Sequence, residues 1–114
     1  MKPTNLIVRK DKKSLEIVFD DDETFELSAE ILRVLSPSAE VQGHSPEQRK
    51  TIGGKRSVEI MKIEPVGNYA VRITFDDMHD TGIFTWTYFR ELGQNVDDKW
   101  AAYLTELEQK GMSR

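Results

Sequence analysis

The sequence predicts an α+β domain that consists of a mainly antiparallel sheet of about five strands, short helices and a C-terminal amphipathic helix. Two observations predict this fold class. Short segments in which apolar and polar residues alternate, such as Leu15–Phe19, are separated by polar turns, as in antiparallel sheets. Helix signals lie between and after these segments, and the longest helical pattern follows Asn95. The 114 residues suit a single domain, 1–114, with one hydrophobic core.

Three strands are expected near the start of the chain. In Leu15–Phe19 apolar side chains recur at every second position, so they share one face of a half-buried strand. Segment 6–8 precedes this strand through a lysine-rich turn, and segment 24–27 follows it after an acidic turn. Because both turns are short, the three segments are predicted to form an antiparallel meander.

Short helices are expected next. Ser28 can cap a helix whose first turn carries Glu30, where a carboxylate complements the helix dipole. This helix ends before Pro37, because proline disfavours helical geometry in the residue that precedes it. Residues 45–48 repeat the capping pattern, with a glutamine placed to close a capping box. The pair 53–54 consists of two glycines and marks the next reversal of the chain.

A second hairpin and a strand-to-helix transition are expected in the second half. Segment 56–65 is rich in branched apolar residues, and a turn signal separates it from 69–75, where apolar side chains again alternate. Segment 83–89 is predicted to begin as a strand and to continue as a helix from Thr85 or Thr87.

The last predicted helix begins at Asn95, which is a favourable cap, and ends at Lys110 and Gly111. We assign its apolar stripe to the hydrophobic core rather than to a ligand-binding platform, because aromatic side chains remove a large apolar area from water. The stripe consists of Trp100, Tyr103, Leu104 and Leu107.

Charge and composition exclude several classes of function. The formal net charge is −4, whereas nucleic-acid binding requires a dense cationic face, so no nucleic-acid partner is expected. No apolar stretch approaches membrane-spanning length and no secretory signal is found, so we expect no membrane partner and a cytoplasmic location. The absence of cysteine excludes disulfides, thiolate metal sites and a cysteine nucleophile, and agrees with a reducing compartment.

The polar loop 32–44 is not explained by simple packing and is the main candidate for a functional surface. Exposed polar loops on a rigid sheet are where recognition usually resides, so we expect this loop to contact a protein partner. Arg33 has an alternative role, in which it braces Glu40 or a helix end. The candidate interaction residues are Arg33, Ser36, Ser38, Glu40, Gln42 and His44.

Two further functions are weighed on the residues alone. His79 with Asp77 or Asp80 offers imidazole and carboxylate ligands, which makes a weak divalent-metal-binding domain the alternative hypothesis. A small hydrolase that uses the region from Ser36 to His44 ranks third, because a hydroxyl, a base and a carboxylate would have to meet in space. The structural interpretation treats the acidic loop as an ordinary reversal and the serines as turn and cap residues.

Several motifs give the chain a resemblance to a known family. They are Leu32–Arg33, Ser36–His44, Gly67–Val71, Phe75–Ile83 apart from Met78, and Trp86. In these motifs, and over nearly its full length, the chain resembles the γ-butyrobetaine hydroxylase-like N-terminal domain family. The resemblance implies a small domain of unknown function that is common as a stand-alone bacterial protein.

In the eukaryotic oxygenases of that name, the resemblance implies an accessory domain that binds structural zinc through three cysteines and one histidine. His79 matches the histidine, but Ser36, Ser38 and Val41 match the cysteines, so the thiolate site cannot form. Met78 stands where the family has glycine, which argues against a left-handed turn at this position unless the loop has shifted.

No catalytic role carries over, because the iron and 2-oxoglutarate ligands of the oxygenases belong to another domain. We therefore expect no enzyme activity and no cofactor. The expected function is that of a non-catalytic accessory or protein-interaction module, whose partner and oligomeric state the sequence leaves open. Related domains attached to ATPases of the iron-sulfur carrier type imply a link to iron-sulfur assembly, or to oxygenase-type partners, by resemblance alone.

Overall fold

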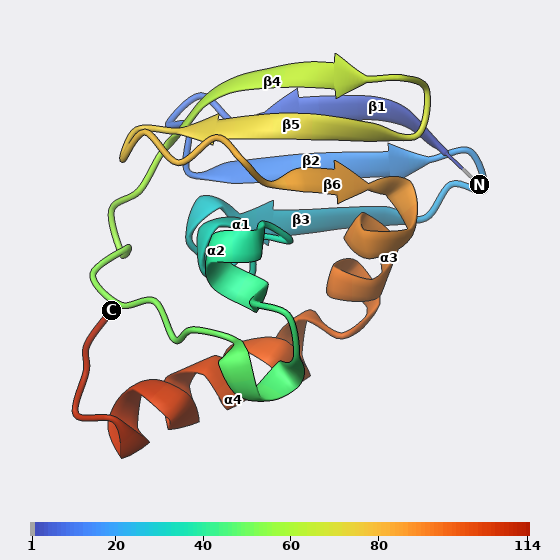
Figure 1. Ribbon diagram of the computed structural model, residues 1–114. Helices are drawn as coiled ribbons and strands as arrows, with labels where there is room; N and C mark the ends of the chain where they lie inside the picture. The colour runs from blue at the N-terminus through green and yellow to red at the C-terminus, as the bar shows by residue number, and fades with distance from the viewer. Residues whose placement is uncertain (1) are drawn as a thin grey trace.

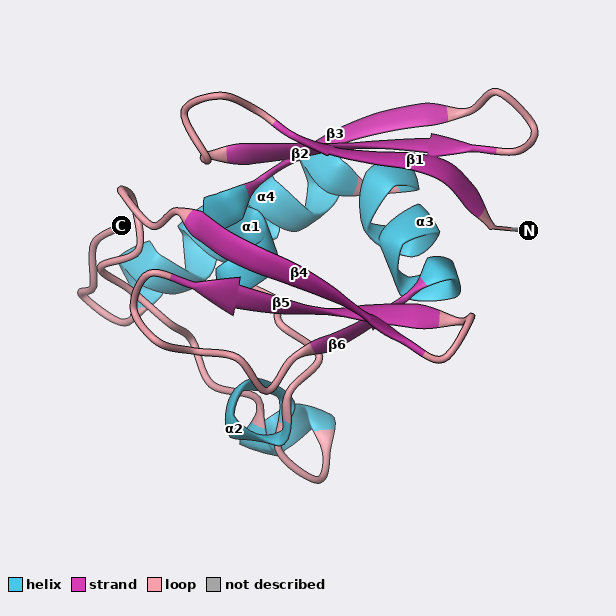
Figure 2. Ribbon diagram, turned by 90° about the horizontal axis from the view of Figure 1, so that it is seen from above, coloured by secondary structure: helices cyan, strands magenta, loops and turns pink. Residues whose placement is uncertain are grey.

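Six strands form two antiparallel sheets in the computed structural model, which describes residues 2–114 apart from the side chain of Pro46. Each sheet contains three strands, in the order β1-β2-β3 and β4-β5-β6. Figure 2 shows the sheets as two separate layers. The strands are β1 (Pro3–Val8), β2 (Ser14–Phe19), β3 (Thr24–Ser28), β4 (Ile60–Val66), β5 (Ala70–Phe75) and β6 (Ile83–Thr85).

The α+β class is confirmed, but the expectation of about five strands in one sheet is wrong. Alternation identifies a strand and its two faces, yet it does not say which neighbour an edge strand takes. Here β3 runs directly into a helix at Ala29, so the first ladder ends there. The long connection 29–59 then leads to β4, which begins a second ladder of its own.

The helices begin where their caps predict. Ser28 Oγ accepts a hydrogen bond from the backbone N–H of Ile31 at 3.0 Å, and Thr85 Oγ1 accepts one from Tyr88 at 3.1 Å. The strand-to-helix transition expected at Thr85 or Thr87 therefore occurs at Thr85. Within residues 2–114 no helix is long and apolar enough to cross a membrane. The helices are α1 (Ala29–Val34), α2 (Ala39–Gln42), the 3-10 turn η1 (Pro46–Gln48), α3 (Trp86–Gln94) and α4 (Val96–Gln109).

The hydrophobic core lies between the inner faces of the two sheets. The side chains of Leu15, Ile17 and Phe19 on β2 are at most 1% exposed, as their alternation predicts. They share one cluster with Ile73 and Phe75 of β5 and with aromatic side chains of β6 and α3. Helices α1 and α3 lie below the strands in Figure 1, so they cover one open side of the stack.

Helix α4 contributes less to the core than its sequence predicts. Tyr103 and Leu107 are buried in a small second cluster with Val34, and Trp100 packs half-buried between the clusters. Leu104 is 39% exposed, so its assignment to the core is wrong. The stripe is narrower than four residues, because α4 packs on α1 through Tyr103 and Leu107, which share a cluster with Val34, and Leu104 is not part of this cluster.

One strand start and one helix cap differ from the prediction. The strand expected over 56–65 begins at Ile60, although Val58 before it is buried. Asn95 precedes α4, but its side chain does not cap that helix. Its Nδ2 donates to the carbonyl of Glu91 at 2.9 Å instead, at the end of α3, where the Asn95 backbone N–H donates to the same carbonyl at 3.2 Å.

We predict that Gly93→Ala destabilises the protein. A Cβ at Gly93 in α3 would lie 2.4 Å from the ring of Phe25 on β3. Alanine normally favours a helix over glycine by about 1 kcal/mol, but overpacking typically costs about 1–3 kcal/mol, so the net change is unfavourable. Urea denaturation should show a lower free energy of unfolding. Gln94→Ala, at the exposed next position, is the matched control and should not lower it.

Candidate functional site

Segments that lie far apart in the sequence meet at one polar site. Ser36 lies in the linker between α1 and α2, and His79 lies in the loop between β5 and β6, with Ser36 Oγ and His79 Nε2 3.0 Å apart. Arg33 Nε and Lys55 Nζ each lie 2.7 Å from Asp77 Oδ2 in the same loop. We call these five side chains the polar corner.

The loop between β5 and β6 fixes the position of His79 through its own backbone. Asp77 Oδ1 accepts a hydrogen bond from the His79 N–H at 3.1 Å, and the carbonyl of His79 accepts one from Phe75 at 3.0 Å. Met78 between them has a φ of 71°. The turn is therefore left-handed despite the missing glycine, and the expectation against it is wrong. An unbranched side chain that is 80% exposed tolerates this geometry at a cost of about 1–2 kcal/mol.

Asp77 is the electrostatic centre of the polar corner. Burial by itself would raise its pKa, but hydrogen bonds from Lys55, the His79 backbone and Arg33 outweigh burial and lower the pKa to about 2. The side chains of Arg33 and Asp77 are only 11% and 19% exposed. The carboxylate is thus charged at neutral pH and holds two cations from separate segments.

His79 is held in its neutral form. Burial, and after it the positive charge of Arg33, lowers the pKa of His79 below its ordinary value. Carboxylates nearby oppose this effect without reversing it. A neutral imidazole has one donor and one acceptor nitrogen, so its Nε2 can pair with a serine hydroxyl in either tautomer.

A serine and a histidine within hydrogen-bond distance raise the question of nucleophilic catalysis. The pair is Ser36 with His79, not Ser36 with His44 as the hydrolase hypothesis supposed. Ser36 is fully buried, and a Cβ on Gly82 would lie 2.2 Å from its Oγ. The backbone at Gly82 therefore covers the hydroxyl, which leaves no room for a substrate carbonyl beside it.

The zinc site that the family resemblance implies does not fit these residues. The structure brings Ser36 and His79 together, and Ser38 and Val41 are buried in the adjoining linker and helix. Hydroxyl and alkyl groups stand where thiolates would be required, and the imidazole nitrogen is already paired with Ser36. The donor set suits a hydrogen-bonded contact and not a tetrahedral metal site.

The predicted interaction residues separate into two groups. Ser36 and Ser38 are 0% and 2% exposed, so their expected exposure is wrong. Ser36 is covered by Gly82 and bonded to His79 of the loop between β5 and β6. Arg33 points at Asp77 and not at Glu40 or a helix end.

The second group remains accessible. Glu40 is exposed and accepts a hydrogen bond from Thr81 Oγ1 at 2.7 Å. Gln42 is half-buried and donates to the Ser36 carbonyl at 3.0 Å. His44 is exposed, and its backbone N–H donates to Gln48 Oε1 at 2.8 Å. The glutamine expected to close a capping box thus bonds the residue before Ser45 and not Ser45 itself. A contact surface on Glu40, Gln42 and His44 stays a prediction.

The candidate metal ligands are also partly occupied. One Asp77 oxygen serves Arg33 and Lys55, while Asp80 is exposed beside His79. Over residues 2–114 no group of three or more His, Cys, Asp or Glu side chains is arranged to hold a metal ion. Divalent-metal binding at this loop therefore has no geometric support and stays a prediction.

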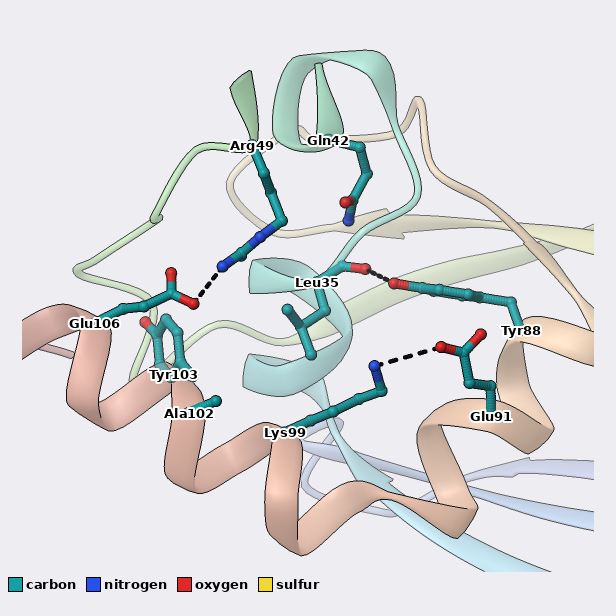
Figure 3. Close-up of a pocket in the computed structure, with 9 residues that line it drawn as sticks. All are labelled: Leu35, Gln42, Arg49, Tyr88, Glu91, Lys99, Ala102, Tyr103 and Glu106. Atoms are coloured by element: carbon teal, nitrogen blue, oxygen red, sulfur yellow. Dashed lines mark hydrogen bonds and ion pairs between the residues drawn. The ribbon is translucent and has the colours of Figure 1, made fainter. Parts of the chain in front are cut away.

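A hollow of about 290 Å³ adjoins the linker on the side of α3 and α4. Figure 3 shows Gln42 and Arg49 pointing into it from the segment around α2, with side chains of α3 and α4 on the other walls. Two ion pairs cross it, Arg49 with Glu106 and Lys99 with Glu91. Sequence reasoning missed this hollow, because no local pattern relates a loop arginine to a helix that begins at Val96.

Tyr88 joins the hollow to the polar corner. Its hydroxyl donates to the carbonyl of Leu35, directly before Ser36, whose own carbonyl is bonded by Gln42. Burial, and after it the charge of Glu91, raises the pKa of Tyr88 to about 12, so the phenol stays a donor. The linker that supports α2 is thus held from both sides.

A family model matches most of the chain. Residues 6–90 match the family described as γ-butyrobetaine hydroxylase-like, N-terminal. The match begins within β1, contains the other five strands and the whole polar corner, and ends within α3. No curated protein matches the chain.

Solved structures share the fold over most of its length. Two NMR solution structures are each 45% identical, cover 99% of this chain and 89% and 84% of their own chains, and have TM-scores of 0.84 and 0.86. A crystal structure of a protein of unknown function from Acidithiobacillus ferrooxidans, a member of the DUF971 family, is 35% identical. It covers 81% of this chain and 92% of its own, with a TM-score of 0.68.

Asp77→Asn should lower the free energy of unfolding by about 2 kcal/mol at pH 7, since the folded state lowers the pKa of this carboxyl from 3.8 to about 2. The contribution of the Asp77 carboxylate to stability is complete above its pKa in the unfolded chain. It is lost as pH falls through its pKa in the folded protein. The gap between wild type and variant in chemical denaturation should therefore close between about pH 4 and pH 2. Asp80→Asn, in the same loop but exposed, should change the stability far less; an equal loss would contradict the assignment.

Stability should also fall under mild acid because of His79. Its folded pKa lies below the unfolded value, so the unfolded chain takes up the proton first as pH falls below about 6.5. Urea titrations from about pH 7 to 5.5 should show this decline in wild type and a smaller one in His79→Gln. His44→Gln removes the other, exposed histidine and should keep the decline. The same slope in wild type and His79→Gln would refute the role of His79.

Proposed function

This chain belongs to the γ-butyrobetaine hydroxylase-like, N-terminal family, and from that premise we propose that it is a non-catalytic protein-interaction module. Its contact surface is formed by α2, by His44 and by the rim of the hollow beside Gln42. A related structure is that of a protein of unknown function, so the proposal rests on this chain's own geometry.

The observation that carries the proposal is the way α2 is held. In Figure 2, α2 lies beyond β6, outside both sheets. Val41 anchors it and is 1% exposed, Glu40 is tied to Thr81, and Gln42 is tied to the Ser36 carbonyl. A helix of four residues has no stability of its own, so these contacts keep a polar surface in one conformation.

The charges around the hollow support recognition of a polar partner. Arg49 and Glu106 are 28% and 27% exposed, and the other pair, Lys99 and Glu91, is 32% and 54% exposed. Partly exposed pairs contribute little to stability, so exchange of their partners for charges of another protein costs little. Such an arrangement favours specificity and orientation over affinity.

The polar corner supports the non-catalytic part of the proposal. Its hydroxyl is covered, its carboxylate is paired with two cations, and its imidazole is bonded to the hydroxyl. Each of these three groups thus has a structural partner. Asp77 and His79 also line a hollow of about 250 Å³ beside Glu40, but the Ser36 hydroxyl is not part of its lining. By resemblance alone, we extend the proposal to partners of the oxygenase or iron-sulfur assembly type.

The test is a site-specific photo-cross-link in the source cell. A photoreactive amino acid in place of His44 should capture one defined protein, whereas the same group in place of Thr24, exposed on β3, should not capture it. Glu40→Ala with Gln42→Ala should then weaken binding of the purified partner at least about tenfold. The midpoint of unfolding of this double variant should stay near that of wild type.

Gln94→Ala, on the exposed side of α3, is the matched control and should bind as wild type does. The proposal fails if positions 44 and 24 capture the same proteins. It also fails if the double variant folds and binds the captured protein with unchanged affinity.

A further inference from the structure

Glu30 is a buried carboxylate in the first turn of α1. It is 5% exposed and is surrounded in its helix by buried apolar residues. Ionised side chains are almost never fully buried unless they are paired, because desolvation of an unpaired charge is costly. Glu30 must therefore have a cation beside it in the folded protein.

That cation is Arg114, which comes from the opposite end of the chain. Arg114 Nε lies 3.0 Å from one carboxylate oxygen of Glu30, and Nη2 lies 2.8 Å from the other. The guanidinium carbon lies 5.0 Å from the ring centroid of Trp100. The guanidinium group thus bonds both oxygens of the carboxylate along one edge while it lies over the indole ring. Arginine is the side chain whose planar, charged group suits both contacts.

The tail that carries Arg114 is held mainly through its backbone. The Gly54 N–H donates to the carbonyl of Ser113 at 2.9 Å, and Met112 N–H donates to Leu107 at 2.8 Å. A Cβ at Gly53 would lie 2.7 Å from the same Ser113 carbonyl. The glycine pair that the sequence marks as a reversal thus leaves the space that an extended segment needs to approach.

We propose that Glu30 and Trp100 form a binding site for the guanidinium group of arginine, which Arg114 fills within the chain. An arginine in an extended segment of a partner protein enters the same site when Arg114 leaves. The occupant needs only a backbone carbonyl for Gly54 and an arginine one residue later, as Ser113 and Arg114 provide. The Arg114 side chain is 35% exposed, so exchange needs release of the tail and no opening of the core.

The site discriminates against other cations by geometry. A lysine ammonium is a point charge, so it cannot bond both oxygens of Glu30 along one edge while it stacks flat on Trp100. Citrulline has the planar shape but no charge, so it would leave the buried carboxylate uncompensated. This inference is independent of the proposed surface at α2, which includes neither Glu30 nor Trp100.

The experiment uses the full chain with Arg114→Ala and, as probe, an amidated synthetic peptide with the sequence of residues 110–114. Binding is followed by NMR through the indole N–H of Trp100, with Trp86 as the internal reference. We expect saturable binding to the variant and at least about tenfold weaker binding to wild type, where the tethered Arg114 competes. Probes with lysine or citrulline in place of the arginine should bind the variant at least about tenfold more weakly.

Two further variants keep the test decisive. Glu30→Gln with Arg114→Ala removes the charge that holds the guanidinium and should abolish binding. Should Arg114→Ala alone unfold, Arg114→Lys keeps a cation beside Glu30 and should bind the arginine probe more tightly than wild type does. The proposal is overturned if arginine and citrulline probes bind a folded variant equally, or if Glu30→Gln with Arg114→Ala binds as Arg114→Ala does.

Discussion

The carboxylate of Asp77 is the contact on which the arrangement outside the core depends. Through Oδ2 it joins Arg33 at the end of α1 to Lys55 in the long connection, and through Oδ1 it fixes the backbone of His79. His79 can then meet Ser36, and the linker that carries α2 is closed against the loop. Removal of one partner would leave a half-buried charge unpaired, and this costs more than the ion pair contributes to stability. The loop and the linker are therefore coupled.

The polar corner lies where the family resemblance implies a zinc site, but its side chains form hydrogen bonds and ion pairs. The family resemblance implies thiolates around this point, where binding of zinc would be coupled to folding. In this chain the same neighbourhood contains a serine hydroxyl, a neutral imidazole and ion pairs. Each of these hydrogen bonds and ion pairs has ordinary strength, so the conformation of the polar corner depends on several of them at once. It is consequently sensitive to the ionisation of Asp77 and His79.

The two recognition surfaces that we propose have different physical bases. At α2 the chain fixes a short polar helix from both flanks and leaves the outer side chains accessible. At the second surface the buried carboxylate of Glu30 is paired with Arg114, which lies 84 residues away in the sequence. The first surface relies on rigidity and mixed charge, and the second on the cost of an unpaired carboxylate. The two surfaces can thus act independently.

The sequence by itself determined the local structure: the buried faces of β2 and β5, the cap at Ser28 and the transition to helix at Thr85. These features follow from backbone periodicity and from hydrogen bonds between residues only a few positions apart. Tertiary structure alone decided that the strands form two sheets, that Ser36 and Ser38 are buried, and that Leu104 is exposed. It also decided the partners of Asp77, Ser36 and Glu30, which lie 44, 43 and 84 residues away. No local pattern encodes such pairs, because packing of whole elements brings them together.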